Sequence, residues 1–505
     1  MSDVVVLPII LPAIAATLML VVARESLALQ RLVSVVSVAA LLPISLILLD
    51  AAGSGPSAYR LGNWTSPFGI ILVNDRLSAI MLVLTAVVSL LALVYSLSGW
   101  DARGRYFHVL FQFQLVGING AFLTGDLFNL FVFFEVMLIA SYGLLLHGDG
   151  PWRLKAGFQY VAVNLIASSL FLIAVGLIYG VTGTLNLAHL NQRVAQLGEE
   201  DAALLRTGAL LLFMVFATKS ALVPLHWWLP GAYSAAPAPS AAIFALLTKV
   251  GAYSILRFHS VAFSSDAAGI STSLQMLVLP AAAVTLAVGA IGVLASRSLL
   301  QLASYSVIAS MGTLLIAGSG LEPAQLSAAL YYTLHSTLIG AALFLLVDIL
   351  AGGRGPTTDR LVPAATLPRP GFLGGLFLLA AMASIGLPPL SGFIGKVAIL
   401  DSLRSAPAAP WAWGVILIAS LVMMVGFVRA GSIVFWQPSE RQSATGSPRI
   451  AAAPIAVVAV LIGLTAALSV FGGEVMTILA ATATEMATPG RYVDAVLPKT
   501  FAEVP

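Results

Sequence analysis

The feature that most constrains this 505-residue sequence is a series of long apolar stretches, separated by short segments that carry most of the charge. Hydrophobic residues make up 59% of the chain and charged residues only 9%, against about 25% charged residues in soluble globular domains. Because about 20 apolar residues span the ~30 Å hydrocarbon core of a bilayer, each stretch is long enough for a membrane-spanning helix. The sequence therefore predicts an all-α polytopic membrane protein.

Fourteen stretches of spanning length can be marked, so we expect about 14 transmembrane helices. They are residues 4–22, 32–49, 77–97, 107–123, 127–146, 157–181, 203–223, 240–256, 274–295, 299–317, 326–350, 371–403, 411–436 and 450–471. The first stretch follows Asp3 and precedes Arg24, which is the wrong charge order for a signal peptide, so we interpret it as a retained helix. With the N-terminus outside, basic residues prevail in the inner segments, as the positive-inside rule requires, and both termini are expected on the outer side.

Several kinds of site are excluded by what the sequence lacks. There is no cysteine, which excludes disulfides, iron–sulfur clusters, thiolate zinc sites and attached c-type haem. The glycine-rich segments 352–355 and 392–396 lack the pattern of a phosphate loop, and no basic face suits nucleic acid. No second histidine or carboxylate stands at ligand spacing for a metal. We therefore expect no cofactor, metal, redox or nucleotide site, so that the chain is not expected to act as an enzyme that moves electrons or hydrolyses ATP by itself.

Basic residues inside the apolar stretches are the first candidates for function. Lys219, Lys249, Lys396 and Arg429 lie there, and they include three of the five lysines of the chain. A charge at the centre of a spanning helix costs at least ~2.5–3.5 kcal/mol. Arginine keeps its proton in a protein, whereas a buried lysine can release it. Lysine at the costly positions thus predicts titration, and the alternative is that these lysines snorkel or form structural ion pairs.

Glu135 and His335 are an acidic and a histidine candidate inside the apolar stretches. Glu135 lies deep in the stretch 127–146 and can hold a nearby lysine in its protonated form, so that separating the two lets the proton leave. A structural salt bridge is the alternative. His335 suits a relay between lysines because histidine titrates near neutral pH, although a buried histidine can also serve only as a hydrogen-bonding group. Asp126 is expected to cap its helix or face the outer vestibule, and Asp348 to lie at the membrane interface.

Prolines predict breaks in two of the spans. Pro224 and Pro230 follow Lys219, and the Pro388–Pro389 pair precedes Lys396. Proline removes a backbone donor, and such breaks persist in membranes only where they are buried in protein or line a wet cavity. The broken spans are helices 7 and 12 by our count, and this odd interval gives them opposite orientations, as an inverted repeat would. Paired interrupted helices are typical of ion sites in transporters.

Three segments carry a resemblance to a known family. The runs 124–135, 218–233 and 247–254 resemble the antiporter-like subunits that Mrp-type multi-subunit cation/proton antiporters share with respiratory complex I. Gly231 and Tyr233 stand where complex I relatives more often have Asp and His, which favours the Mrp side. The resemblance implies two inverted five-helix units, helices 4–8 and 9–13. The expected regions are 1–105 (helices 1–3), 106–258 (first unit), 259–436 (second unit) and 437–505 (helix 14 and an outer tail).

The resemblance also implies roles for the residues singled out above. Glu135 and Lys219 would form the coupling pair of the first half-channel, Lys249 and His335 would carry protons across the middle, and Lys396 would end the second half-channel. It further implies a Na⁺ or other monovalent cation/H⁺ antiporter in the bacterial plasma membrane, with the other Mrp antiporter subunits (of types A, B, C, E, F and G) and membrane lipid as partners. The alternatives are a proton-pumping subunit of complex I or of a membrane-bound hydrogenase, and a facilitator for a small organic solute.

Overall fold

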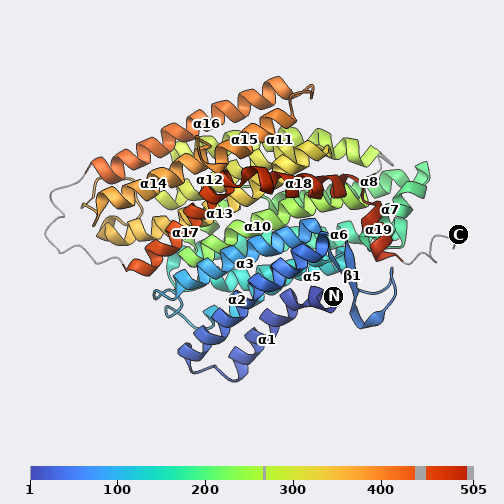
Figure 1. The fold of residues 1–505 in the computed structure, drawn as a ribbon, viewed down its shortest axis with the longest axis horizontal. Coiled ribbons are helices and arrows are strands. Elements are labelled where there is room, and N and C mark those ends of the chain that lie inside the picture. Colours follow the sequence, from blue (N-terminus) through green and yellow to red (C-terminus); the bar gives the residue numbers. More distant parts are fainter. Residues whose placement is uncertain (1, 265–268, 365, 438–450, 498–505) are drawn as a thin grey trace.

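The computed structural model describes residues 2–264, 269–364, 366–437 and 451–497, and these residues form a bundle of long helices (Figure 1). In the described residues, 12 helices are long and apolar enough to cross a membrane. They are α1 (Leu7–Val21), α2 (Leu27–Ala52), α3 (Arg76–Ser96), α5 (Leu127–Leu146), α6 (Pro151–Thr182), α8 (Glu199–Lys219), α10 (Ala238–Arg257), α11 (Ile270–Ala295), α12 (Leu299–Ala317), α13 (Pro323–Gly353), α16 (Ala409–Gly431) and α17 (Ala452–Val470). The predicted all-α membrane fold is confirmed.

Shorter elements complete the bundle. Two further apolar helices of 17 and 16 residues are α4 (Phe107–Leu123) and α14 (Pro370–Ile385). The other helices and the strands of one antiparallel hairpin are α7 (Leu187–Gln196), α9 (Trp228–Ala235), α15 (Ser391–Ser402), α18 (Gly472–Ala487), α19 (Gly490–Val496), β1 (Ser57–Arg60) and β2 (Ile71–Asn74). The exact count of 14 spans, the four regions and the two repeats stay predictions, and region 437–505 falls partly outside the described residues.

Both predicted breaks are present. The α8 helix ends at Lys219, and Ala221 then adopts a positive φ of 53° before α9 begins. The stretch 371–403 divides into α14 and α15, with Gly386 at φ 85° directly after α14. Because a left-handed residue cannot continue a right-handed helix, these residues end the helices and leave their last carbonyls available to other donors.

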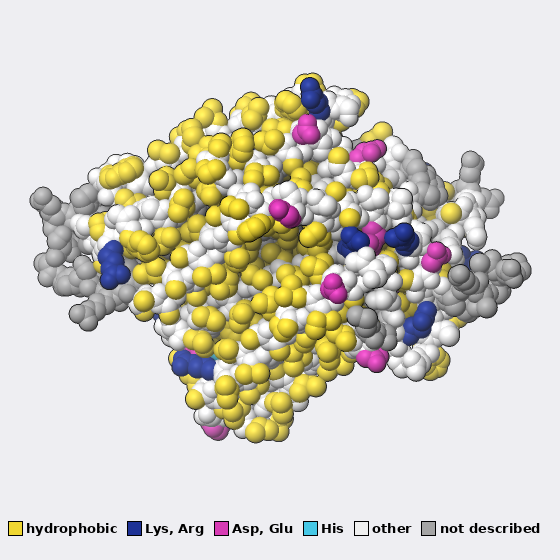
Figure 2. Space-filling view, viewed as in Figure 1, with side chains coloured by type: hydrophobic (Ala, Val, Ile, Leu, Met, Phe, Trp, Pro, Cys, Tyr) yellow, Lys and Arg dark blue, Asp and Glu magenta, His cyan; other side chains and the backbone are white. Residues whose placement is uncertain are grey.

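Apolar residues lie both in the core and on the surface. Every residue of α10 is buried, so this helix runs through the centre of the bundle. The outer helices expose large apolar side chains, and Figure 2 shows hydrophobic side chains over most of one face with few charges between them. A water-soluble protein rarely exposes such a continuous apolar surface, whereas a bilayer solvates it.

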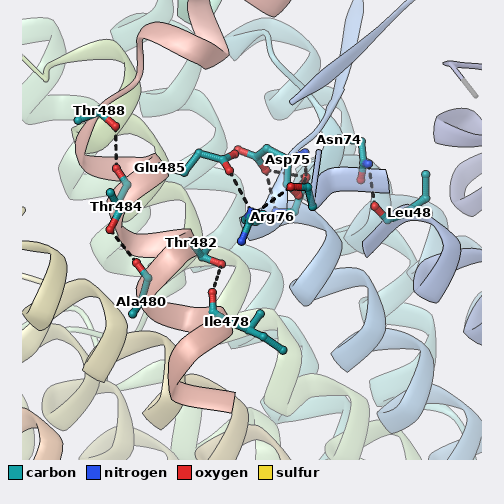
Figure 3. Close-up of polar contacts among 12 residues, drawn as sticks. Leu48, Asn74, Asp75, Arg76, Ile478, Ala480, Thr482, Thr484, Glu485 and Thr488 are labelled. Carbon is teal, nitrogen blue, oxygen red and sulfur yellow. Dashed lines mark hydrogen bonds and ion pairs between the residues drawn. The ribbon is translucent and has the colours of Figure 1, made fainter. Parts of the chain in front are cut away.

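An ionic clamp joins the start of α3 to α10 and α18, and Figure 3 shows its contact between Arg76 and Glu485. Asp75, the N-cap of α3, forms a buried ion pair with Arg257, and Arg76 lies 3.5 Å from the carboxylate of Glu485. Burial opposes the charge of Asp75, but the Arg257 guanidinium and hydrogen bonds from Ser78 together hold its pKa below the ordinary value. This clamp fixes α18 against the central helices.

Two helix starts are built alike at opposite ends of the bundle. The side chain of Asp126 caps α5 through the Asn129 N–H at 2.8 Å, and that of Ser298 caps α12 through the Gln301 N–H at 3.2 Å. Each cap residue also forms an isolated antiparallel bridge, Asp126 with Asn186 and Ser298 with Arg360. Asp126 lies at the start of α5, and the opposite end of α5 is followed directly by the start of α6 with Trp152. Trp152 lines the same cavity as Ser298. The two caps therefore lie at opposite ends of the bundle.

Candidate functional site

Lys219 ends α8 with its ammonium group inside the bundle. Its side chain is 5% exposed, and Nζ donates to Asn164 Oδ1 of α6 at 2.9 Å. The same ammonium lies 6.0 Å from the centre of the Phe134 ring. The break after Lys219 is held by Trp228 of α9, which donates from Nε1 to the Thr218 carbonyl at 3.1 Å. The interrupted helix therefore fixes the position of the lysine.

Glu135 also contacts α6, the helix that carries the Asn164 partner of Lys219. It is half-buried on α5, and its Oε1 accepts a hydrogen bond from Ser168 of α6. Ser168 and Asn164 are four residues apart and therefore share one face of α6. Glu135 and Lys219 form no ion pair within 4.0 Å among the described side chains. The predicted pair is thus connected through two neutral residues of α6 rather than by direct contact.

Asn164 and Ser168 are functional candidates that sequence reasoning missed. Both are buried, at 1% and 6% exposure, although each stands in an apolar spanning helix. The available signal was their spacing of four residues within the stretch 157–181, which places two polar groups on one helix face. Polar residues in spanning helices bond across to neighbouring helices, and here they bond to the two charged candidates.

Lys249 lies in the middle of the buried helix α10. Its Nζ donates to Ser310 Oγ of α12 at 3.2 Å and lies 3.4 Å from Met311 Sδ. Two residues beyond Lys249, α10 packs closely against the end of α8, because a Cβ atom added at Gly251 would lie 2.6 Å from Ser220 Oγ. The glycine lets α10 approach the end of α8, and this brings the helices of Lys219 and Lys249 together.

A small cavity connects the partner of Lys249 to His335. Its volume is about 20 Å³, which is room for one water molecule, and Ser310 and His335 both line it. Ser306, Ser336 and Ser384 add hydroxyl groups to its wall. A water in this cavity could therefore find several polar partners. The structure thus links Lys249 to the cavity beside His335 through Ser310.

His335 and Lys396 meet at the second break. His335 Nδ1 hydrogen-bonds with Ser391 Oγ, the first residue of α15, at 2.8 Å. Lys396 Nζ donates to the Ile385 carbonyl at the end of α14 and to Ser420 Oγ of α16, both at 2.7 Å. The ammonium thus binds the negative end of a helix dipole. A Cβ at Gly386 would lie 2.8 Å from Lys396 Cδ, so this side chain packs directly across the break.

The remaining charged candidates have structural contacts. Asp126 caps α5, as predicted. The predicted interfacial position of Asp348 stays a prediction. Its carboxylate accepts hydrogen bonds from Tyr95 and Trp100 at 2.7 and 2.8 Å and so ties α13 to α3 and the loop after it. Arg429 stands in the last turn of α16 and donates to the Ser296 carbonyl. Among the described residues, no group of three or more His, Cys, Asp or Glu is placed to hold a metal ion.

Comparison with known families assigns the chain by its sequence. Residues 124–427, which include all five candidates of the relay, match the transmembrane family described as NADH:quinone oxidoreductase/Mrp antiporter. The chain belongs to this family. The matched region covers more than half of the chain, from the start of α5 into α16.

Relatives of this family match almost the whole chain. The D subunit of a probable K⁺/H⁺ antiporter of Rhizobium meliloti is 42% identical over 98% of this chain and 98% of the relative. The D subunit of a Na⁺/H⁺ antiporter of Bacillus subtilis is 35% identical over 98% of this chain and 100% of the relative.

Solved structures of the family share the fold. A chain of the Mrp complex of a Dietzia species superimposes with a TM-score of 0.88 at 26% identity, covering 98% of this chain and 100% of that chain. A chain of respiratory complex I from Thermus thermophilus gives 0.80 at 25% identity, covering 96% and 99%. The fold is therefore common to both branches of the family, and the sequence similarity to the D-type antiporter subunits is found along the entire chain.

Proposed function

We propose that this chain is the proton-translocating, D-type subunit of a multi-subunit monovalent cation/H⁺ antiporter in the bacterial plasma membrane. The observation that carries this proposal is the small cavity that His335 shares with Ser310, the hydrogen-bond partner of Lys249. The names of the similar proteins from Rhizobium and Bacillus support the antiport activity, with Na⁺ or K⁺ as the cation. Partner subunits of types A, B, C, E, F and G, and both termini on the outer side, belong to the same proposal.

The path of the proton follows the hydrogen-bond contacts. A proton on Lys249 passes to Ser310, across the small cavity to His335, and on past Ser391 towards Lys396. Two steps of this path are direct hydrogen bonds, Lys249 to Ser310 at 3.2 Å and His335 to Ser391 at 2.8 Å. The cavity and the step from Ser391 to Lys396 separate the other groups. Hydroxyl groups and water can relay protons because each both donates and accepts.

The first half supplies the switch. Protonation changes along the path from Lys249 would make and break the Glu135–Lys219 contact, as Lys219 exchanges its bond to Asn164 for one to Glu135 along the same face of α6. Making and breaking this Glu135–Lys219 contact is the step that we propose to couple to cation transport. Glu135 and Lys219 can meet directly only if α5, α6 and α8 rearrange. The contact would therefore have two states, one joined and one separated.

The halves of the transporter are related by inversion in this proposal. The caps of α5 and α12, each with its antiparallel bridge to a later loop, support this relation because they lie at opposite ends of the bundle. In each bridge, the first helical residue donates to the loop, Leu127 to Leu185 and Leu299 to Asp359. Inverted repeats with interrupted helices are a common basis for alternating access.

The second candidate function is a proton-pumping membrane subunit of a redox complex, which the likeness to complex I favours. The relay would be the same, and the driving reaction would take place in other subunits. Genes for redox subunits next to the gene of this chain would favour this alternative, and genes for small membrane subunits would favour the antiporter.

Antiport by the complete complex tests the proposal. Everted vesicles from cells expressing all subunits are energised, and the pH change on addition of Na⁺ or K⁺ is followed by fluorescence. Lys219→Ala should abolish the response while the subunit remains in the complex, because the switch loses its cation. Lys155→Ala removes an exposed lysine of α6 and serves as the matched control. Normal antiport in Lys219→Ala would contradict the proposed role.

A further inference from the structure

A large basic cavity lies apart from the relay, at the end of the bundle where α12 begins. Its volume is about 840 Å³. Arg297, Arg360 and Arg429 line it, with Asp359 as the acidic residue of the wall and Trp152 at its side. A cavity of this size is typical of a binding site for a small molecule or a molecular head group.

The wall of the cavity is held rigidly in place. Arg354 is 1% exposed and donates to the carbonyls of Thr358, Arg360 and Val362, so it ties the loop together from beneath. Thr358 has a positive φ of 48°, which a non-glycine residue adopts only when its surroundings enforce it. The loop that carries Arg360 is thus preorganised.

The positive charge of this cavity is not neutralised by the wall. Arg297 and Arg360 are exposed, and neither forms an ion pair with the described residues. The Asp359 carboxylate accepts the backbone N–H of Leu300 at 3.4 Å, so it faces the start of α12. Three guanidinium groups against one carboxylate favour an anion with several acceptor oxygens, and phosphate matches the fork of arginine.

The position of the cavity indicates where this phosphate comes from. All its walls are helix ends or loops: the start of α6 and α12, the ends of α9 and α11, and the last turn of α16. The ends of spanning helices are expected at the level of the lipid head groups. Trp152 is 60% exposed, as is typical of aromatic residues at the membrane interface.

Apolar surface continues from the cavity towards the membrane centre. On α16, Val425 and Leu421 stand one and two turns below Arg429 on the same face, and they are 49% and 57% exposed. On the adjacent α11, Ile291 and Val284 are 61% and 49% exposed. A free phosphate ion would gain nothing from this surface, whereas the acyl chains of a lipid would lie along it.

We propose that this cavity binds the phosphate of an anionic phospholipid, with Arg297, Arg360 and Arg429 as its ligands and its acyl chains along α11 and α16. Basic pockets between transmembrane helices bind anionic head groups in other membrane proteins. This site is distinct from the relay and does not depend on the proposed transport function. It gives the complex a lipid requirement at the loop that connects α13 to α14.

Lipid titration of the purified complete complex tests this site. Phosphatidylglycerol is added in detergent, and bound lipid is counted by native mass spectrometry, with phosphatidylcholine as the neutral comparison. The double variant Arg297→Gln/Arg360→Gln should bind phosphatidylglycerol about 30-fold more weakly, at about 1 kcal/mol per arginine and 1.4 kcal/mol per tenfold change. Arg297→Lys/Arg360→Lys should keep most of the binding, because lysine also holds phosphate.

The control removes equal charge from the same end of the bundle. Lys155→Gln/Arg369→Gln changes two exposed residues that do not line the cavity, and it should bind phosphatidylglycerol like the unaltered complex. Equal binding by both Gln double variants would overturn the proposal, as would equal binding of phosphatidylcholine. Thermal protection by inorganic phosphate as strong as that by phosphatidylglycerol would show a free-anion site instead. Loss of another subunit with unchanged lipid binding would show a protein interface instead.

Discussion

Lys219 and Lys396, the lysines beside the two helix breaks, form hydrogen bonds with different kinds of partner. In the first half, Lys219 donates to an amide, and a carboxylate lies across the same face of α6. In the second half, Lys396 donates to a main-chain carbonyl and to a hydroxyl group. The helix that would correspond to α5 is α12, and it contains no acidic residue to match Glu135.

This difference indicates a division of labour. The carbonyl at the end of α14 offers a fixed partial charge, so Lys396 is stabilised without a partner that can move or titrate. Glu135 carries a full charge on a separate helix, and its distance from Lys219 can change with the packing of α5, α6 and α8. In the function that we propose, the first half would therefore switch, and the second would hold a proton at a fixed place before its release.

Replacing Lys396 with arginine is the strongest test of this comparison. If Lys396 only needs to be positive, Lys396→Arg should work, since the Ile385 carbonyl and Ser420 can accept from arginine as well. If Lys396 must release a proton, antiport should fall at least about tenfold, because arginine does not deprotonate in proteins. Cation-dependent pH change in everted vesicles measures the rate, and Lys155→Arg is the control. Unchanged antiport in Lys396→Arg would mean that the second half uses charge alone.

Removing the neutral hydrogen-bond partners of Lys219 and Lys396 should slow antiport less than replacing the lysine itself, and the loss should differ between the two lysines. Asn164→Ala takes from Lys219 the one hydrogen bond that we find for it, and a bond to a charged group contributes about 1.5–3 kcal/mol. Antiport should slow by about tenfold or more. Ser420→Ala leaves the Ile385 carbonyl on Lys396, so it should slow antiport only by a few-fold.

A serine pair on α6 provides the control for this second prediction. Ser168 bonds to Glu135, whereas the neighbouring Ser169 is exposed and bonds to its own helix at Leu165. Ser168→Ala should impair antiport and Ser169→Ala should not, as both rates in the same vesicle assay will show. A larger loss in Ser420→Ala than in Asn164→Ala would reverse the comparison between the halves.

The sequence was sufficient for the fold class, and it singled out the ionisable candidates, because membrane insertion makes both conspicuous. A lysine in an apolar stretch is costly, and prolines beside it disrupt the helix, so Lys219 and Lys396 stand out without any structure. The breaks after Lys219 and before Lys396 were predicted on this basis and are present.

Contacts between distant segments could not be predicted in the same way. Asn164, Ser310 and Ser420 are ordinary polar residues of spanning helices, and only the packing of α6, α12 and α16 shows that each bonds to a lysine. The same limit applies to Asp348, whose partners Tyr95 and Trp100 lie about 250 residues earlier in the chain. Charge and hydropathy identify the charged residues that are costly to bury in a membrane. They do not identify the neutral polar residues that form hydrogen bonds with those charges.

The smallest predicted effect concerns the caps of α5 and α12, which correspond in the proposed repeat. Burial raises the pKa of Asp126 to about 6, although hydrogen bonds from the backbone of Asn129 and Phe128 act in the opposite direction. The unfolded chain has the ordinary value of 3.8. Between these values the folded protein binds a proton that the unfolded chain does not bind, so stability falls as the pH rises from about 4 to about 6.

Asp126→Asn should remove this pH dependence without removing the cap, because asparagine caps helices about as well as aspartate. The melting temperature of the purified protein is followed by tryptophan fluorescence at pH 4.5 and pH 7. The decrease in melting temperature between these two pH values should be smaller in Asp126→Asn than in the unaltered protein. Ser298→Ala should instead cost about 1 kcal/mol equally at both pH values, because serine does not titrate. If Asp126→Asn melts with the same pH dependence as the unaltered chain, the Asp126 carboxyl is already ionised at pH 4.5. The two caps would then differ in charge as well as in residue type.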